Sequence, residues 1–255
     1  MMVSKTTSNC SNCLRLQKEN TRLKELLAAQ NISWDAKKPT AENSPAAVEK
    51  PVHQYSPEEK IVLFRRLFCG RTDVYPVRWE SKKGGAGYSP ACGNEWRSGV
   101  CGKPRVKCGV CKQRRLLPVT DRVIYNHLSG QHTIGVYPLL NDDRCYFLAT
   151  DFDESSWRDD ALAFMQSCKE LDIPAALEIS RSGQGAHTWI FFSEAVSATE
   201  ARKLGAALIS YTCSRTRQLS LDSYDRFFPN QDTLPRGGFG NLIALPLQKD
   251  PREKG

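Results

Sequence analysis

The sequence predicts an α+β protein whose core, residues 142–250, has the element order β-α-β-β-α-β. Short runs of apolar, aromatic and branched residues indicate strands at 145–150, 175–180 and 187–192. Apolar residues at helical spacing indicate helices at 156–171 and 198–213. A last strand is expected at 242–247, and 219–224 is a candidate for one more strand before it.

This element order is the split βαβ plan of ferredoxin-like and RNA-recognition-type domains. The antiparallel sheet of that plan has its first strand in the middle, between the third and the fourth. The end of the strand at 145–150 is therefore expected beside the start of the strand at 187–192. Side chains that lie far apart in the sequence then meet at one edge of the sheet.

Two segments before the core are expected to stand apart from it. Residues 1–30 are predicted to hold a short helix, because the spacing of a coiled-coil seam recurs at Cys13, Leu16, Asn20, Leu23 and Leu27. Such a helix would support a weak dimer. Residues 31–54 are rich in Pro, Ala, Lys, Glu and Asn without periodicity, so we interpret them as a flexible linker.

Residues 55–141 are expected to form an N-terminal module. Its first helix is indicated by a serine cap followed by proline and, three residues after the cap, glutamate, at Ser56, Pro57 and Glu59. A loop-rich zinc-binding element is expected at about 88–115. Four thiolates suit a closed tetrahedral zinc site, and free cysteines in a loop are the alternative. The four cysteines, separated by eight, six and two residues, are Cys92, Cys101, Cys108 and Cys111.

The charge favours a polyanionic partner, since the 255 residues carry a formal net charge of +8. Neither a secretory signal nor a bilayer-spanning apolar run is present, so a cytoplasmic location without membrane association is expected. Basic side chains around the cysteines are candidates for binding the backbone phosphates of a single-stranded nucleic acid, and a solvated basic loop is the alternative. They are Lys103, Arg105, Lys107, Lys112, Arg114 and Arg115.

Two carboxylates, Asp151 and Asp153, follow the first strand of the core. Side chains two apart on a strand point to the same face, and hard cations such as Mg²⁺ or Mn²⁺ prefer oxygen ligands. A solvated turn that caps the next helix is the alternative. A third carboxylate, from either Asp225 or Asp222, would complete a clamp for two metal ions.

The segment before the third core strand is rich in hydrogen-bond donors and glycine. Arg181, Ser182 and Gln184 offer donors for phosphate oxygens, and His187 starts the strand that should lie beside Asp151. The glycines let the backbone pass close to a ligand. A simple flexible hairpin is the alternative, although it leaves the histidine unexplained.

Three motifs in order resemble the archaeo-eukaryotic primase superfamily, above all the primase-polymerase domains of bacterial TOTE conflict systems. They are DFD, then SRSGQGAH followed by TWIFF, then YDRFFPNQD with GGFGNLIALPLQ, and the similarity covers about residues 55–250. The resemblance places metal ligands at Asp151 and Asp153 and favours Asp225 as the third. It places a phosphate contact at His187 within Gly185-Ala186-His187, where family members often have serine at the first position.

The resemblance implies a DNA primase-polymerase that uses nucleoside triphosphates, a single-stranded DNA template and two Mg²⁺ or Mn²⁺ ions. It also implies work with a helicase or nuclease partner. Two other functions are weighed against it. One is a zinc-containing nucleic-acid-binding module that has lost catalysis, which two carboxylates beside phosphates argue against. The other is a metal-dependent nuclease that uses the same acids.

Overall fold

The computed structural model describes residues 18, 21–22, 24–25, 55–215 and 222–254, and the chain divides into two compact units, 1–53 and 54–255. The described residues of the first unit are helical. The five seam residues and the linker predicted at 31–54 lie outside the described residues. The coiled coil, the weak dimer and the linker therefore stay predictions.

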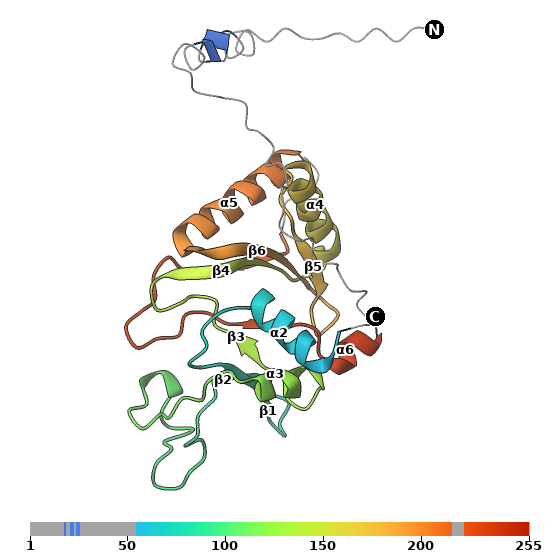
Figure 1. The fold of residues 1–255 in the computed structure, drawn as a ribbon. Coiled ribbons are helices and arrows are strands. Elements are labelled where there is room, and N and C mark those ends of the chain that lie inside the picture. Colours follow the sequence, from blue (N-terminus) through green and yellow to red (C-terminus); the bar gives the residue numbers. More distant parts are fainter. Residues whose placement is uncertain (1–17, 19–20, 23, 26–54, 216–221, 255) are drawn as a thin grey trace. The chain divides into compact units, whose positions relative to one another are not determined.

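The second unit is built on a four-stranded antiparallel sheet (Figure 1). Along the chain its elements are β4 (Arg144–Phe152), α4 (Trp157–Glu170), β5 (Ala176–Ile179), β6 (Ala186–Ser197), α5 (Ala198–Arg215) and β7 (Tyr224–Phe228). The strand order is β5-β6-β4-β7, so β4 lies between β6 and β7. The mixture of helices and antiparallel sheets confirms the predicted α+β class.

Each face of this sheet has its own hydrophobic core. Leu148 and Phe152 of β4 pack with Phe164 of α4 under the two long helices. Phe147 of β4 and Trp189 of β6 face the other way and pack with residues of the N-terminal module. Because side chains alternate along a strand, successive residues of β4 belong to the two cores in turn.

The N-terminal module covers the face opposite α4 and α5 (Figure 1). It comprises α2 (Pro57–Leu67), the hairpin of β1 (Pro76–Glu80) and β2 (Ala86–Pro90), the short 3-10 helix η2 (Cys108–Val110), α3 (Asp121–Leu128) and β3 (Gly135–Val136). The predicted capping box at the start of α2 is present: Ser56 Oγ accepts from Glu59 N, and the Glu59 carboxylate accepts from Ser56 N. No helix in the described ranges combines the length and apolar character needed to cross a bilayer.

The last strand was assigned wrongly from the sequence. Only β8 (Ile243–Ala244) forms within the segment 242–247, and it pairs with β3 instead of joining the core sheet. It is apolar because Ile243 and Leu245 are buried in the core shared with the N-terminal module. The fourth strand of the core sheet is β7, whose charged residues hide the alternation expected of a strand. A helix, α6 (Lys249–Lys254), follows β8.

Candidate active site

Three carboxylates meet at one end of the core sheet. Asp151 is the second-last residue of β4, Asp153 follows that strand directly, and Asp225 belongs to β7. One oxygen from each lies within 4.8 Å of the others. Asp151 is half-buried, whereas Asp153 and Asp225 are exposed. Within the described residues, this is the one set of three or more acidic, histidine or cysteine side chains that meets this distance limit.

A β-bulge brings Asp225 into this acidic group. Asp151 pairs with Arg226, and Phe152 pairs with Tyr224, so Asp225 is an extra residue in β7 at this point. Tyr224 and Phe227 both pack toward the helices, and the two residues between them are left free to face the acids. Bulges re-aim side chains in this way. Asp222, the other sequence candidate, is exposed and is not part of the group.

His187 lies beside the acidic group, as its expected place in the sheet requires. It pairs directly with Asp151 across β6 and β4. Its Nε2 lies 3.5 Å from Asp151 Oδ1, and its Nδ1 lies 2.9 Å from Glu178 Oε2. Only 8% of the residue is exposed. Topology therefore joins the acidic motif and the histidine motif, which are separated by more than thirty residues in the sequence.

The electrostatics of the group favour an added cation. The pKa of Asp151 is raised to about 6, chiefly by burial; His187 and Arg226 act to lower it, and the charges of Asp153 and Asp225 act to raise it. Burial by itself would lower the pKa of His187. Glu178 and the acids outweigh that effect, so the net shift of this pKa is upward. Clustered oxygen donors with excess negative charge fit Mg²⁺ or Mn²⁺ well.

The turn between β5 and β6 approaches the acids at Gly185. A Cβ placed there would lie 2.5 Å from Asp153 Oδ1 and 2.8 Å from the Phe152 carbonyl oxygen. Glycine is therefore required by this close approach. Within the turn, Ser182 Oγ accepts from Gln184 N at 3.2 Å.

The other donors predicted in this turn are less directly placed. Arg181, Ser182 and Gln184 are exposed. Arg181 and Ser182 line a cavity of about 580 Å³ that Glu178 and Trp189 also line. Arg181 and Ser182 therefore border a cavity on the Glu178 side of His187, which neither Gln184 nor any of the three acids lines.

Two side chains of the site escaped sequence analysis, Glu178 and Arg226. Glu178 pairs with His187 across β5 and β6, and Arg226 donates through Nε to Asp225 Oδ2 at 2.6 Å. The available signal was a charged residue inside each short strand, Ala-Leu-Glu-Ile and Tyr-Asp-Arg-Phe-Phe. That signal becomes informative only with the strand register, which the sequence does not specify.

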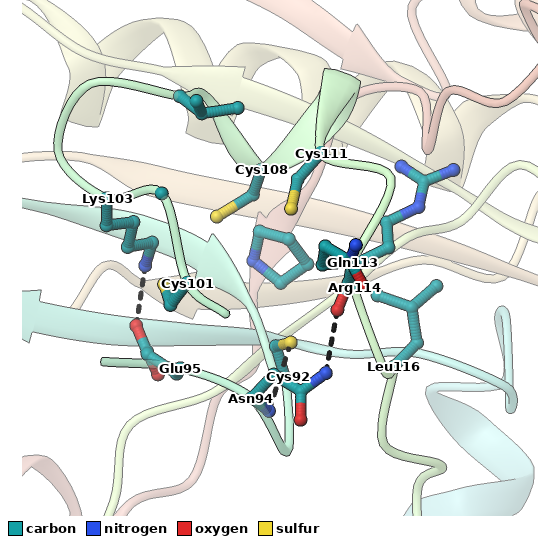
Figure 2. A pocket seen from close by; sticks show the side chains of 13 residues that line it. Cys92, Asn94, Glu95, Cys101, Lys103, Cys108, Cys111, Gln113, Arg114 and Leu116 are labelled. Carbon is teal, nitrogen blue, oxygen red and sulfur yellow. Dashed lines mark hydrogen bonds and ion pairs between the residues drawn. The ribbon is translucent and has the colours of Figure 1, made fainter. Parts of the chain in front are cut away.

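The four clustered cysteines line one pocket in the N-terminal module (Figure 2). Cys92 Sγ accepts hydrogen bonds from the backbone N–H groups of Asn94 at 3.4 Å and Arg115 at 3.3 Å. The thiolate is the form of cysteine that binds a metal. No three sulfur atoms in the described residues meet the 4.8 Å limit that the carboxylates satisfy. Four thiols in a loop-rich segment are nevertheless the donor set that a structural zinc site uses.

The six basic side chains around the cysteines divide into two kinds. Lys103 is held by Glu95 at 2.5 Å, and Arg114 donates to the carbonyl oxygens of Gly109 and Gly237, both at 3.0 Å. Both are partly buried and serve the module itself. The remaining four are exposed: Arg105, Lys107, Lys112 and Arg115, of which Arg115 also donates to the Gly93 carbonyl oxygen at 3.4 Å.

The fold and the site together define a class of protein: antiparallel α+β domains in which clustered carboxylates and an adjacent imidazole form a site suited to divalent cations. The chain belongs to one family of that class: the model of the archaeo-eukaryotic primase domain of TOTE conflict systems matches residues 59–255. This match confirms the resemblance inferred from the three motifs. Domains of this family are generally nucleotidyltransferases and typically use divalent metals. A comparison with curated proteins gives no match.

Proposed function

We propose that the chain is a DNA primase-polymerase that extends or initiates a strand on a single-stranded DNA template, using nucleoside triphosphates and a two-metal mechanism. One observation carries the proposal: carboxylates from β4 and β7 converge with an imidazole from β6, in a chain of the primase family. The convergence requires three distant segments and a bulge, which a solvated acidic turn would not need.

In this mechanism Asp151, Asp153 and Asp225 would hold two Mg²⁺ or Mn²⁺ ions. When bound, the ions would lower the pKa of the attacking hydroxyl and stabilise charge on the α-phosphate and the pyrophosphate. His187 would donate from Nε2 to a phosphate oxygen of the nucleotide. Arg181, Ser182 and Gln184 would supply further donors from the β5–β6 turn, and Gly185 lets that turn approach the acids.

The N-terminal module would hold the template strand. Cys92, Cys101, Cys108 and Cys111 would bind a structural Zn²⁺ that fixes the surrounding loops. The exposed cations of those loops, Arg105, Lys107, Lys112 and Arg115, would then bind backbone phosphates. A helicase or nuclease partner would supply single-stranded template or act on the product.

Primed and unprimed single-stranded DNA, incubated with the protein, nucleotides and Mg²⁺ or Mn²⁺, tests the proposal. Asp151→Asn and Asp153→Asn are expected to lower incorporation by roughly 100-fold or more, since each removes transition-state charge stabilisation. Asp225→Asn should do the same, whereas Asp222→Asn, its matched control, should keep the unmodified rate. Binding without incorporation would favour the non-catalytic module, and degradation of the DNA would favour the nuclease. Equal activity of the Asp225 and Asp222 variants would remove Asp225 from the site.

A further inference from the structure

The carboxylate of Glu178, which is not part of the acidic group, contacts the edge of the His187 ring opposite to the one that faces Asp151. Glu178 Oε2 lies 2.9 Å from His187 Nδ1 and 3.0 Å from Trp189 Nε1. On the opposite side of the ring, Nε2 lies 3.5 Å from Asp151 Oδ1. The imidazole therefore bridges two carboxylates that have different surroundings, one inside the acidic group and one behind it.

The strand register produces this row of side chains. Glu178 pairs with His187 between β5 and β6, and His187 pairs with Asp151 between β6 and β4. Directly paired residues in an antiparallel sheet place their side chains next to each other on one face. The row thus crosses three strands and needs no loop to position it.

Trp189 keeps the Glu178 carboxylate in place. Its indole is buried, with 1% exposed, and its ring centroid lies 5.1 Å from Phe147 and 4.9 Å from Phe68. A buried indole N–H requires an acceptor, and Glu178 Oε2 is that acceptor. Because the indole is fixed by the core, the carboxylate that it binds is also fixed.

We propose that Glu178 is a positioning residue that orients His187, so that Nε2 faces the phosphates of a nucleotide bound at the acidic group; this inference rests on the proposed function. An imidazole can turn by half a rotation about its Cβ–Cγ bond, which exchanges nitrogen for carbon at each edge. Donation from Nδ1–H to Glu178 stabilises one of these orientations and leaves Nε2 to the active site. Glu178 acts through His187 and does not itself contact substrate.

The kinetic test compares Glu178→Gln with Glu194→Gln, which removes an exposed carboxylate from β6. Glutamine keeps the size of the side chain and weakens the bond to Nδ1. We expect kcat/KM for nucleotide incorporation to fall about 10-fold or more in Glu178→Gln, in line with other partners that orient a histidine. The loss should include a higher KM for nucleotide, whereas the KM for primed template should not change. Kinetics equal to those of Glu194→Gln would overturn the proposal.

A second measurement does not depend on activity. The chain has four histidines, so the ring ¹⁵N–¹H signals of His187 can be assigned by their loss in His187→Gln. We expect a slowly exchanging Nδ1–H proton in the unmodified protein and in Glu194→Gln, shifted upfield in Glu178→Gln. A His187 ring protonated at Nε2 alone in the unmodified protein would overturn the proposal, whatever the stability of the variants. If the unmodified protein incorporates no nucleotide, the proposed function fails, and this spectrum still decides how the ring is held.

Discussion

Replacing Gly185 with alanine should damage the acidic group through a single added methyl. The new Cβ would lie 2.5 Å from Asp153 Oδ1 and 2.8 Å from the Phe152 carbonyl oxygen. An ordinary contact is about 3.4 Å, so the Asp153 oxygen would have to move by about 0.9 Å unless the turn itself moved away. Either movement would change the position of Asp153 relative to the β5–β6 turn, and the proposed mechanism needs both at the nucleotide.

Two magnitudes follow from this displacement. Overpacking of this kind costs about 1–3 kcal/mol of folding free energy. A misplacement near 1 Å in an active site lowers the rate on the order of 100-fold. We therefore expect Gly185→Ala to lose about 100-fold in nucleotide incorporation and to bind Mn²⁺ more weakly, while it remains folded.

The assay is primer extension together with calorimetric titration of Mn²⁺, and Gly85→Ala is the matched control. A Cβ at Gly85 would meet only the Ser81 hydroxyl, at 3.2 Å, and the residue lies in the β1–β2 hairpin. That variant should keep both the rate and the affinity. If Gly185→Ala also kept both, the close approach of the turn to Asp153 would have no part in the site.

Two further predictions concern stability and metal content. Burial lowers the pKa of His127 from 6.5 to about 4. The neutral ring donates to Pro246 O and accepts from Ile134 N. The contribution of this ring to folding stability is therefore complete above pH 6.5 and is lost as the pH falls toward 4. Denaturant unfolding at pH 7 and pH 5 should therefore show a loss about 2 kcal/mol larger in the unmodified protein than in His127→Gln, and the exposed His132→Gln should behave as unmodified; equal losses in all three would contradict the assignment. The purified protein should contain about one equivalent of zinc. Cys101→Ser should lower both the zinc content and the melting temperature, whereas substitution of the exposed Cys213 by serine should change neither. A zinc content below about half an equivalent in the unmodified protein would count against the site.

Local patterns predicted much of the core. The helices expected at 156–171 and 198–213 correspond to α4 (Trp157–Glu170) and α5 (Ala198–Arg215), because an amphipathic helix repeats its apolar residues whatever it packs against. The segment 242–247 was wrongly predicted to be a strand of the core sheet, because its residues are buried against the N-terminal module and are as apolar as those of a core strand. The charged strand β7 was expected only as a candidate at 219–224, which overlaps it at Tyr224 alone, because two of its residues face the acidic group and break the apolar pattern.

The sequence by itself identified a carboxylate pair, a histidine after a glycine turn and four cysteines as donors, because their residue types and local spacing can be read without a structure. Only the tertiary structure decided which of them meet. The register of β5, β6 and β4 joined Glu178, His187 and Asp151, and the bulge in β7 selected Asp225 over Asp222. Register and bulges depend on cross-strand contacts between distant residues, so no local pattern encodes them.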